Sequence, residues 1–181
     1  MGDVHRAVFL DRDGVLIRAI IRDGKPYAPA NPEEIEILPG VSEALERLKR
    51  SGYLLIVVTN QPDVARGNLH QADVEAIHSR MAEVLPVDDF FSCFHDSGDE
   101  CDCRKPRPGM LLDAASRWNV DLSRSYMVGD RWRDVDAGNA AGCTVFFVDY
   151  GYDEPRPSGL YWRVNSLSEA VNLIMREEEE A

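Results

Sequence analysis

The feature that most constrains the fold of this chain is a set of short apolar runs that alternate with amphipathic stretches. The runs are bounded by turn residues and span 7–10, 54–58, 126–128 and 144–148, with a weaker candidate at 90–93. Strands that are apolar at nearly every position are typical of parallel sheets buried on both faces. The alternation therefore predicts the α/β class, as a Rossmann-like three-layer α/β/α sandwich with a mainly parallel sheet.

Apolar residues at helical spacing between these runs predict the helices that cover the sheet. The expected helices span 41–48, 74–84 and 111–118, and a last helix starts at Ser166. The last helix begins with Ser-Leu-Ser-Glu, a spacing typical of a capping box. Stretches rich in Pro and Gly predict loops at 24–40, 104–109 and 151–159.

Length and charge limit the possibilities further. The chain has 181 residues, and 20 Lys and Arg oppose 32 Asp and Glu, which gives a formal net charge of −12. One hydrophobic core suffices at this length, so we predict a single domain over 1–176 and a frayed acidic tail over 177–181. The charge opposes nucleic-acid binding, and no apolar run approaches the roughly 18 residues of a membrane span. We expect a cytoplasmic monomer that binds neither nucleic acid nor membrane.

Acidic residues follow two of the predicted strands. Asp11-Arg12-Asp13-Gly14 comes directly after the first run, and Asp130 and Asp134 follow the run at 126–128. Because open α/β folds bind ligands at the carboxyl ends of their strands, these acids are expected to converge on one site. Asp11, Asp130 and the backbone carbonyl of Asp13 would supply the hard oxygens that Mg²⁺ prefers. Asp134 fits a ligand that acts through water, and equally well a first-turn acid favoured by the helix dipole.

Phosphate-binding side chains are expected at the same edge of the sheet. Thr59 and Lys105 offer a hydroxyl and an ammonium group to phosphate oxygens. The candidate substrate-binding residues are Asn60, Gln61, Arg66, Arg104 and Arg131. The arginines would hold an anionic substrate through bidentate contacts, although a surface role explains Arg66 and Arg131 equally well.

Three thiols and one imidazole lie close together in the sequence. They belong to Cys93, His95, Cys101 and Cys103. Four such ligands, with no position left open, are typical of a structural zinc site, which would rigidify the loop that carries Lys105. A labile disulfide and a redox-sensing thiol pair are the alternatives.

The remaining cysteine and histidines are given no ligand role. Cys143 lies at the edge of an apolar run, which is typical of a small core residue. His5, His70 and His78 have no partner that the sequence identifies, and they are interpreted as surface or helix-face residues.

The motifs Asp-x-Asp-Gly, Thr-Asn, Lys and Gly-Asp-x-x-x-Asp occur in this order. They resemble the haloacid dehalogenase-like phosphohydrolases from about residue 7 to residue 150. The resemblance implies that Asp11 is the nucleophile that forms an aspartyl-phosphate and that Asp13 is the general acid and base. It also implies that Thr59 and Lys105 hold the phosphoryl group and that Asp130 binds Mg²⁺. The gaps between the motifs leave no room for a cap domain, so three loops are expected to set specificity, at 15–31, 62–69 and 94–104.

The cysteine–histidine loop narrows this resemblance. Cys-x-His followed by Cys-x-Cys-Arg-Lys-Pro is similar to the subgroup of heptose bisphosphate 7-phosphatases and histidinol-phosphate phosphatases. Ala65-Arg66-Gly67 and Pro108-Gly109-Met110 are closer to the heptose enzymes. The resemblance implies a Mg²⁺-dependent sugar-phosphate phosphatase, with histidinol phosphate or another small metabolite as the alternative substrate. A phosphate-sensing binding module without catalysis is the alternative from another functional class.

Overall fold

Six parallel strands form one sheet in the computed structural model, which describes residues 3–180 of the chain. Their spatial order is β5-β4-β1-β6-β7-β8, and every neighbouring pair runs parallel. The strands are β1 (Arg6–Leu10), β4 (Tyr53–Asn60), β5 (Asp89–Cys93), β6 (Tyr126–Gly129), β7 (Thr144–Val148) and β8 (Trp162–Val164). A separate antiparallel hairpin consists of β2 (Ile20–Arg22) and β3 (Lys25–Tyr27).

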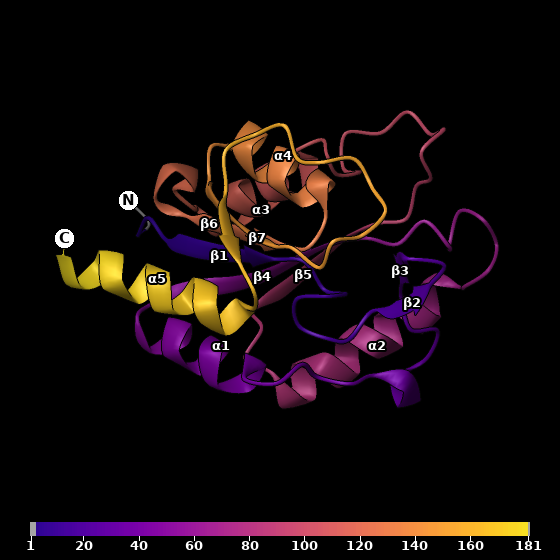
Figure 1. Ribbon diagram of the computed structural model, residues 1–181, viewed down its shortest axis with the longest axis horizontal. Helices are drawn as coiled ribbons and strands as arrows, with labels where there is room; N and C mark the ends of the chain where they lie inside the picture. The colour runs from indigo at the N-terminus through magenta and orange to yellow at the C-terminus, as the bar shows by residue number, and fades with distance from the viewer. Residues whose placement is uncertain (1–2, 181) are drawn as a thin grey trace.

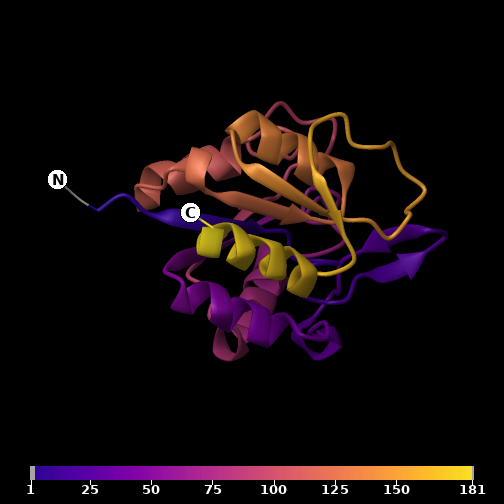
Figure 2. The same ribbon diagram turned by 60° about the vertical axis from the view of Figure 1, so that its left-hand side comes forward.

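Helices cover both faces of the sheet (Figure 1). One face carries α1 (Val41–Arg50), α2 (Gln71–Val84) and α5 (Leu167–Glu180), and the other carries α3 (Gly109–Trp118) and α4 (Trp132–Ala141). Figure 2 shows the same three layers from a second direction. Two short 3₁₀ turns, η1 (Pro32–Glu34) and η2 (Leu122–Arg124), lie in the connections. The predicted three-layer α/β/α sandwich with a mainly parallel sheet is confirmed.

Side chains of the central strands alternate between two hydrophobic cores. In β1, Val8 and Leu10 pack into the core beneath α1, α2 and α5, while Ala7 and Phe9 pack into the core beneath α3 and α4. All four side chains are fully buried. This alternation is the period of two expected of a strand, and burial on both faces explains why the runs are apolar throughout.

One helix and three short strands leave no clear signal in the sequence. The helix α4 packs small residues against the sheet, and a Cβ added to Gly138 would crowd Val145 and Met127. A helix that packs this closely lacks the large apolar residues on which a periodicity analysis depends. The strand β8 has three residues, two of them exposed, and the hairpin β2–β3 lies partly in the stretch 24–40 that was predicted to be a loop.

The acidic tail was predicted wrongly for residues 177–180, because α5 continues through Glu180. Glu177 accepts a hydrogen bond from the hydroxyl of Tyr126 at 2.8 Å, and Glu178 accepts one from Tyr53 at 2.6 Å and pairs with Arg6. The tyrosine rings are largely buried, so their hydroxyls need acceptors at the end of the sheet. These contacts hold the last turns of the helix in place. Ala181 lies outside the described residues.

Two of the residues without a predicted ligand role are buried. Cys143 packs into the core beneath α3 and α4, as predicted, and burial raises the pKa of its thiol to about 12. His78 was predicted at a surface or helix face, but it is only 8% exposed and its ring stacks on Phe90 at 4.5 Å between centroids. It therefore belongs to the interior between α2 and the edge strand β5.

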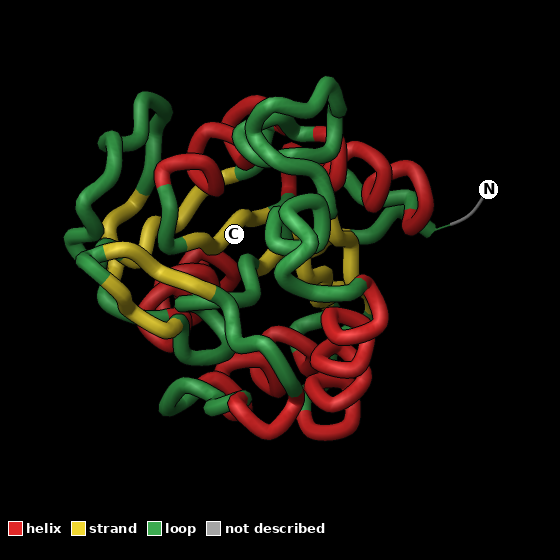
Figure 3. The backbone as a smooth tube through the Cα atoms, turned by 90° about the vertical axis from the view of Figure 1, so that its right-hand side faces the viewer, coloured by secondary structure: helices red, strands yellow, loops and turns green. Residues whose placement is uncertain are grey.

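Three neighbouring strands place the candidate functional residues at one end of the molecule. Since β1 pairs with both β4 and β6, the segments at Asp11, Thr59 and Asp130 emerge side by side. Figure 3 looks onto the end where the loops and the hairpin β2–β3 gather. No helix within residues 3–180 combines the length and apolar character needed to cross a bilayer.

Candidate active site

Three buried carboxylates from β1, β6 and α4 meet at the centre of this edge. Asp11 follows β1, Asp130 follows β6, and Asp134 lies in the first turn of α4. One oxygen atom from each lies within 4.8 Å of the other two. Gly14 has φ +88°, and a Cβ there would overlap the carboxylate of Asp130, so only glycine lets the loop pass this close.

The electrostatics of this cluster fit a divalent cation. Burial, followed by the charges of Asp11 and Asp134, raises the pKa of Asp130 well above its ordinary value. Burial and the charge of Asp11 likewise raise the pKa of Asp134 to about 6. Oδ1 of Asp130 is buried and has no hydrogen-bond partner within the described residues. Converging hard oxygens with an unused acceptor are the donor set that Mg²⁺ takes in proteins.

The metal cluster differs in one member from the set predicted from the sequence. The carboxylate of Asp134, which was assigned only an indirect or capping role, lies in the cluster and also accepts a hydrogen bond from the Arg131 backbone N–H at 2.9 Å. That contact is a helix-capping bond, as expected of an acid in the first turn of a helix. A role for Asp134 as a metal ligand stays a prediction. The contribution of Asp13 through its backbone carbonyl stays a prediction.

Lys105 supplies the positive charge beside these acids. Its ammonium nitrogen lies 2.9 Å from Asp11 Oδ1, 2.6 Å from Asp134 Oδ1 and 2.7 Å from the carbonyl oxygen of Val58. Burial alone would lower the pKa of Lys105, but the two carboxylates outweigh burial and raise the pKa above its ordinary value. The lysine is therefore charged in the folded protein.

Asn60 positions the backbone of the lysine. Its amide donates to the carbonyl of Lys105 and accepts from the N–H of Lys105, both at 3.0 Å. The residue also lines the pocket, but its amide group is occupied by this pair of hydrogen bonds. Asn60 was predicted as a substrate-binding residue, and the structure gives it in addition a role in holding the loop that carries Lys105.

The carboxylate of Asp13 is held by two neighbours. The side-chain amide of Gln61 donates to Asp13 Oδ2 at 3.1 Å and to the Thr59 hydroxyl at 2.9 Å. Arg12 donates from Nε to both carboxylate oxygens of Asp13 at 3.2 Å. Since the Thr59 oxygen accepts from Gln61, its own proton is free to be donated to a ligand. Of the two predicted phosphate donors, Lys105 contacts the cluster directly, whereas Thr59 is buried and contacts Gln61, which links it to Asp13.

A cavity of about 260 Å³ opens above this cluster, and all three predicted loops line it. The loop 15–31 contributes Lys25 to Ala28, the loop 62–69 contributes Pro62, Asp63 and Arg66, and the loop 94–104 contributes Arg104. Asp11, Asp13, Lys105 and Asp134 line the same cavity. Its size suits a small phosphorylated molecule, and two carboxylates of the cluster, Asp11 and Asp134, form part of its wall.

Four arginines surround the cavity. Arg66 forms two hydrogen bonds with Asp96, both at 2.7 Å, and Arg131 pairs with Glu154. Arg104 donates to the carbonyl of His95 at 3.1 Å. Arg66 and Arg131 thus combine a carboxylate partner with a place in the wall of the cavity.

The fourth arginine was not identified from the sequence. Arg133 has no carboxylate partner for a hydrogen bond within residues 3–180, and burial together with Arg131 and Arg104 lowers its pKa. A cation held near other cations, without a carboxylate hydrogen-bonded to it, is available to an anionic ligand. Its spacing from Asp130, in Gly-Asp-Arg-Trp-Arg-Asp, was the signal available in the sequence.

Two tyrosines close the other side of the carboxylate cluster, and the sequence analysis missed both. The Tyr152 hydroxyl donates to Asp130 Oδ2 at 2.8 Å, and the Tyr150 hydroxyl donates to the carbonyl of Gly14 at 2.8 Å. The two rings pack together with centroids 5.5 Å apart. They come from the loop after β7, and no local sequence pattern indicates that this loop contacts Asp130.

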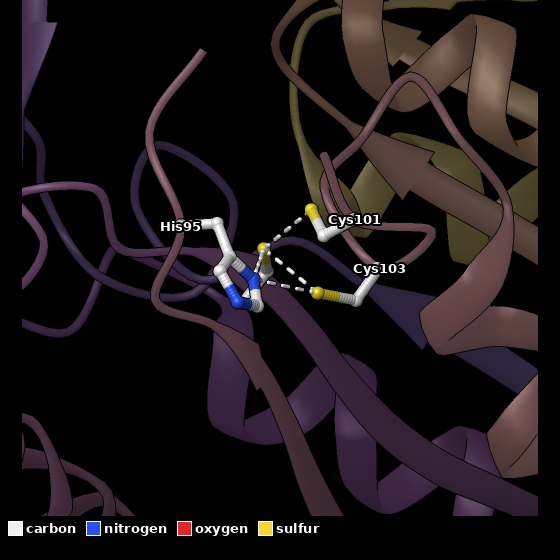
Figure 4. A group of neighbouring side chains, drawn as sticks. His95, Cys101 and Cys103 are labelled. Carbon is white, nitrogen blue, oxygen red and sulfur yellow. Dashed lines mark hydrogen bonds between the residues drawn. The ribbon is translucent and has the colours of Figure 1, made fainter. Parts of the chain in front are cut away.

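The cysteine and histidine side chains converge on one point, as Figure 4 shows. The ligand atoms of Cys93, His95, Cys101 and Cys103 all lie within 4.8 Å of one another. Nδ1 of His95 lies 3.2 Å from the sulfur of Cys103, and the sulfurs of Cys93 and Cys101 are 3.9 Å apart. All four cysteines of the chain are free thiols. Three sulfurs and one nitrogen at these separations fit a tetrahedral ion.

A family model described as haloacid dehalogenase-like hydrolase matches residues 27–142. The chain belongs to the haloacid dehalogenase-like hydrolases. The family predicted from the four motifs is thereby confirmed. In this hydrolase, the motif residues Asp11, Thr59, Lys105 and Asp130 gather at one sheet edge, as that resemblance implied.

This hydrolase is similar to proteins named D-glycero-beta-D-manno-heptose-1,7-bisphosphate 7-phosphatase. The relative from Bordetella bronchiseptica is 38% identical over 151 residues, which cover 81% of this chain and 82% of the relative. The relative from Escherichia coli K12 is 35% identical over 190 residues, which cover 97% of this chain and 96% of the relative.

Solved structures agree with these sequence relatives. The crystal structure of a D,D-heptose 1,7-bisphosphate phosphatase from B. bronchiseptica, complexed with magnesium and phosphate, has a TM-score of 0.81 at 34% identity. It covers 95% of this hydrolase and 99% of that chain. A putative HAD-like phosphatase from Mesorhizobium loti has a TM-score of 0.78 at 32% identity, and the match covers 99% of this hydrolase and 90% of that chain.

Proposed function

We propose that this hydrolase is a Mg²⁺-dependent phosphatase that removes the 7-phosphate of heptose 1,7-bisphosphate through an aspartyl-phosphate on Asp11. The observation that carries the proposal is that Asp11 lines the cavity, pairs with Lys105 and lies beside the buried carboxylates of Asp130 and Asp134. The names of the relatives support the substrate, and the magnesium and phosphate in the B. bronchiseptica structure support the cofactor.

The first chemical step transfers the phosphoryl group to the protein. A carboxylate oxygen of Asp11 attacks phosphorus, the bond from phosphorus to the sugar oxygen breaks, and Asp13 donates its proton to the leaving alkoxide. Lys105 and the Thr59 hydroxyl hold the phosphoryl oxygens while the charge redistributes. Asp11, Asp130 and Asp134 are the residues that would hold Mg²⁺, which supplies positive charge to the phosphoryl oxygens.

The second step releases phosphate. Asp13, now a carboxylate, takes a proton from water, and the oxygen of that water attacks phosphorus. The bond from phosphorus to Asp11 then breaks, so inorganic phosphate leaves and both aspartates return to their starting states. The hydrogen bonds from Arg12 and Gln61 hold the side chain of Asp13 at the wall of the cavity.

The arginines around the cavity favour a second phosphate on the substrate. Arg66, Arg104, Arg131 and Arg133 line it together with Lys25. A bisphosphate places a second anion among these cations, whereas histidinol phosphate would place a cationic amine there. Like charges repel at short range in a partly buried site, so the alternative substrate is disfavoured.

We also propose that Cys93, His95, Cys101 and Cys103 hold a structural zinc ion. Four protein ligands leave no open position for water, which excludes a catalytic metal of the usual kind. The free thiols and the imidazole that converges with them support zinc over a disulfide. The ion would fix the loop that continues into Arg104 and Lys105.

The substrate is tested by measuring phosphate release from three classes of ester. Purified enzyme with Mg²⁺ is assayed on heptose 1,7-bisphosphate, on histidinol phosphate and on a panel of sugar phosphates. We expect the highest kcat/KM for the β anomer of the bisphosphate, which the relatives' names specify. Equal or higher kcat/KM for histidinol phosphate would contradict the proposed substrate while leaving the phosphatase chemistry intact.

A further inference from the structure

Arg12 lies behind the general acid and is sealed from solvent. Its side chain has no exposed surface, although arginine is seldom fully buried. Nε donates to both oxygens of Asp13, and Nη2 lies 3.1 Å from Asp13 Oδ2 as an ion pair without a well-aligned hydrogen bond. The orientation of the Asp13 carboxylate therefore depends on where this guanidinium group sits.

The far end of the guanidinium group contacts a histidine from another element. Nη1 of Arg12 lies 3.2 Å from Nε2 of His78, in helix α2. Arginine nitrogens only donate, so Nε2 must accept and the ring must be neutral, with its proton on Nδ1. Burial, and then the charge of Arg12, lower the pKa of His78 to about 3, in keeping with a neutral ring.

The histidine is itself fixed by packing. Its ring is buried and stacks on Phe90 of strand β5 with 16° between the ring planes. A line of contacts thus runs from the edge strand through His78 and Arg12 to Asp13. None of the described contacts of His78 reaches the cavity, so the ring acts only through Arg12.

We propose that His78 and Arg12 are positioning residues that aim the Asp13 carboxylate at the leaving-group oxygen. The inference rests on the proposed function, in which Asp13 is the general acid. Without the acceptor on His78, Nη1 of Arg12 becomes an unsatisfied buried donor and the guanidinium group shifts to find another partner. Asp13 shifts with it, and a displacement of about 1 Å at a reacting group can cost about a hundredfold in rate.

Two substitutions of His78, both to unbranched side chains of similar length, test the role of Nε2 as the acceptor for Arg12. His78→Met replaces it with a thioether, which accepts hydrogen bonds only weakly, and His78→Gln supplies an amide oxygen of similar reach. Each variant is assayed on the best alkyl ester of the substrate panel and on p-nitrophenyl phosphate. An alkoxide needs a proton as it leaves, whereas p-nitrophenolate leaves unprotonated, so only the alkyl ester depends strongly on Asp13. Using kcat/KM limits the comparison to the first phosphoryl transfer.

We expect His78→Met to lower kcat/KM for the alkyl ester on the order of tenfold or more, with little change for the aryl ester and for KM. His78→Gln should recover most of the loss. Asp13→Asn removes the general acid itself, so its ratio of the two kcat/KM values gives the largest change expected. Met81→Leu, which alters packing on the same helix without a polar contact, should leave the ratio of the two kcat/KM values unchanged.

If His78→Met leaves the ratio of the two kcat/KM values unchanged, whether or not both values fall, the inference is overturned, because a purely structural role affects both substrates alike. If His78→Met does not fold, Arg12→Lys tests the same contact, since an ammonium group cannot span Asp13 and His78 as the fork does. An Arg12→Lys variant with the wild-type ratio would also overturn it. Failure of the wild type to hydrolyse either ester would instead overturn the proposed function.

Discussion

The ammonium nitrogen of Lys105 lies 2.9 Å from Oδ1 of Asp11, and both side chains are almost completely buried. This ion pair joins the candidate nucleophile to a buried lysine, and both residues line the cavity. It also links two loops that lie 94 positions apart in the sequence. The position of the Asp11 carboxylate therefore depends on the loop that carries Lys105 as well as on its own.

Lys105→Met should lower kcat/KM on the order of a hundredfold to a thousandfold, since the phosphoryl oxygens lose a charged donor. The variant should also unfold at a lower temperature in buffer without divalent ions, because three carboxylates then share one buried site without a cation. Steady-state kinetics and thermal unfolding measure the two effects. Lys49→Met removes a partly exposed ion pair with Asp88 and should leave the kinetics unchanged. Comparable losses in both variants would contradict the assignment.

Much of this edge was predictable because the motifs at Asp11, Thr59 and Asp130 stand at the ends of buried strands. Strand ends are set by hydrophobicity, and parallel strands bring their carboxyl ends together, so Asp11, Thr59 and Asp130 converge by topology alone. Tyr152 was missed because its role depends on a loop that folds back over the site, whereas Arg133 was overlooked although it stands next to Asp134 in the same motif. His78 was misassigned because histidine is polar, although its place beside Val74, Ile77 and Met81 at i, i+3, i+4 and i+7 puts it on the buried face of α2.

Mg²⁺ should stabilise the enzyme more at higher pH. Burial and neighbouring charges raise the pKa of Asp134 to about 6 and that of Asp130 well above its ordinary value. A folded state that binds protons more tightly than the unfolded chain loses stability as pH rises from about 4 through 6, in the absence of a metal ion. Because Mg²⁺ must displace these protons, its effect grows over the same range.

Thermal unfolding at about pH 5 and about pH 7.5, with and without Mg²⁺, measures this linkage. The rise in Tm on adding Mg²⁺ should be clearly larger at the higher pH. Asp134→Asn removes one of the titrating groups and should reduce the difference between the two pH values. A Mg²⁺ effect that is the same at both pH values would contradict the assignment of this cluster as the metal site.

Tyr152→Phe should weaken Mg²⁺ binding on the order of tenfold, because the Tyr152 hydroxyl orients Asp130 through a hydrogen bond of 2.8 Å. Calorimetric titration of the protein with Mg²⁺ measures the dissociation constant directly. Tyr161→Phe is the matched control, since that ring packs edge-on against Phe147. Equal Mg²⁺ affinity in Tyr152→Phe and the wild type would show that Asp130 needs no such support.

Cys103→Ser should abolish zinc binding, lower Tm and reduce kcat/KM. Cys103 lies two residues before Lys105, so release of the ion loosens the segment that carries the phosphate-binding lysine. Elemental analysis should find about one zinc per wild-type chain and close to none in the variant. Cys143→Ala changes a buried thiol outside the cluster and should keep its zinc. Wild-type protein without zinc but with full activity would exclude the structural ion.

The cysteine cluster also marks a limit of what the spacing alone predicts. The ligand types were evident from Cys-x-His and Cys-x-Cys, but the spacing alone left a disulfide as an alternative. In the structure the four ligand atoms converge, because β5 ends at Cys93 and the chain returns past this residue before α3 begins. By contrast, the helical tail at Glu178 was unpredictable, since its partners Tyr53 and Arg6 are distant in sequence.

The central claim is that Asp11 takes the phosphoryl group, and a rapid-quench experiment followed by peptide mass spectrometry tests it most directly. Enzyme mixed with Mg²⁺ and the best substrate is stopped in acid during turnover, and the peptide that contains Asp11 is examined for an added phosphoryl group. We predict a phosphorylated Asp11 that disappears with hydroxylamine and is absent from an inactive Asp11→Asn variant. Turnover with no phosphorylated Asp11 at any time, together with activity in Asp11→Asn, would contradict the account.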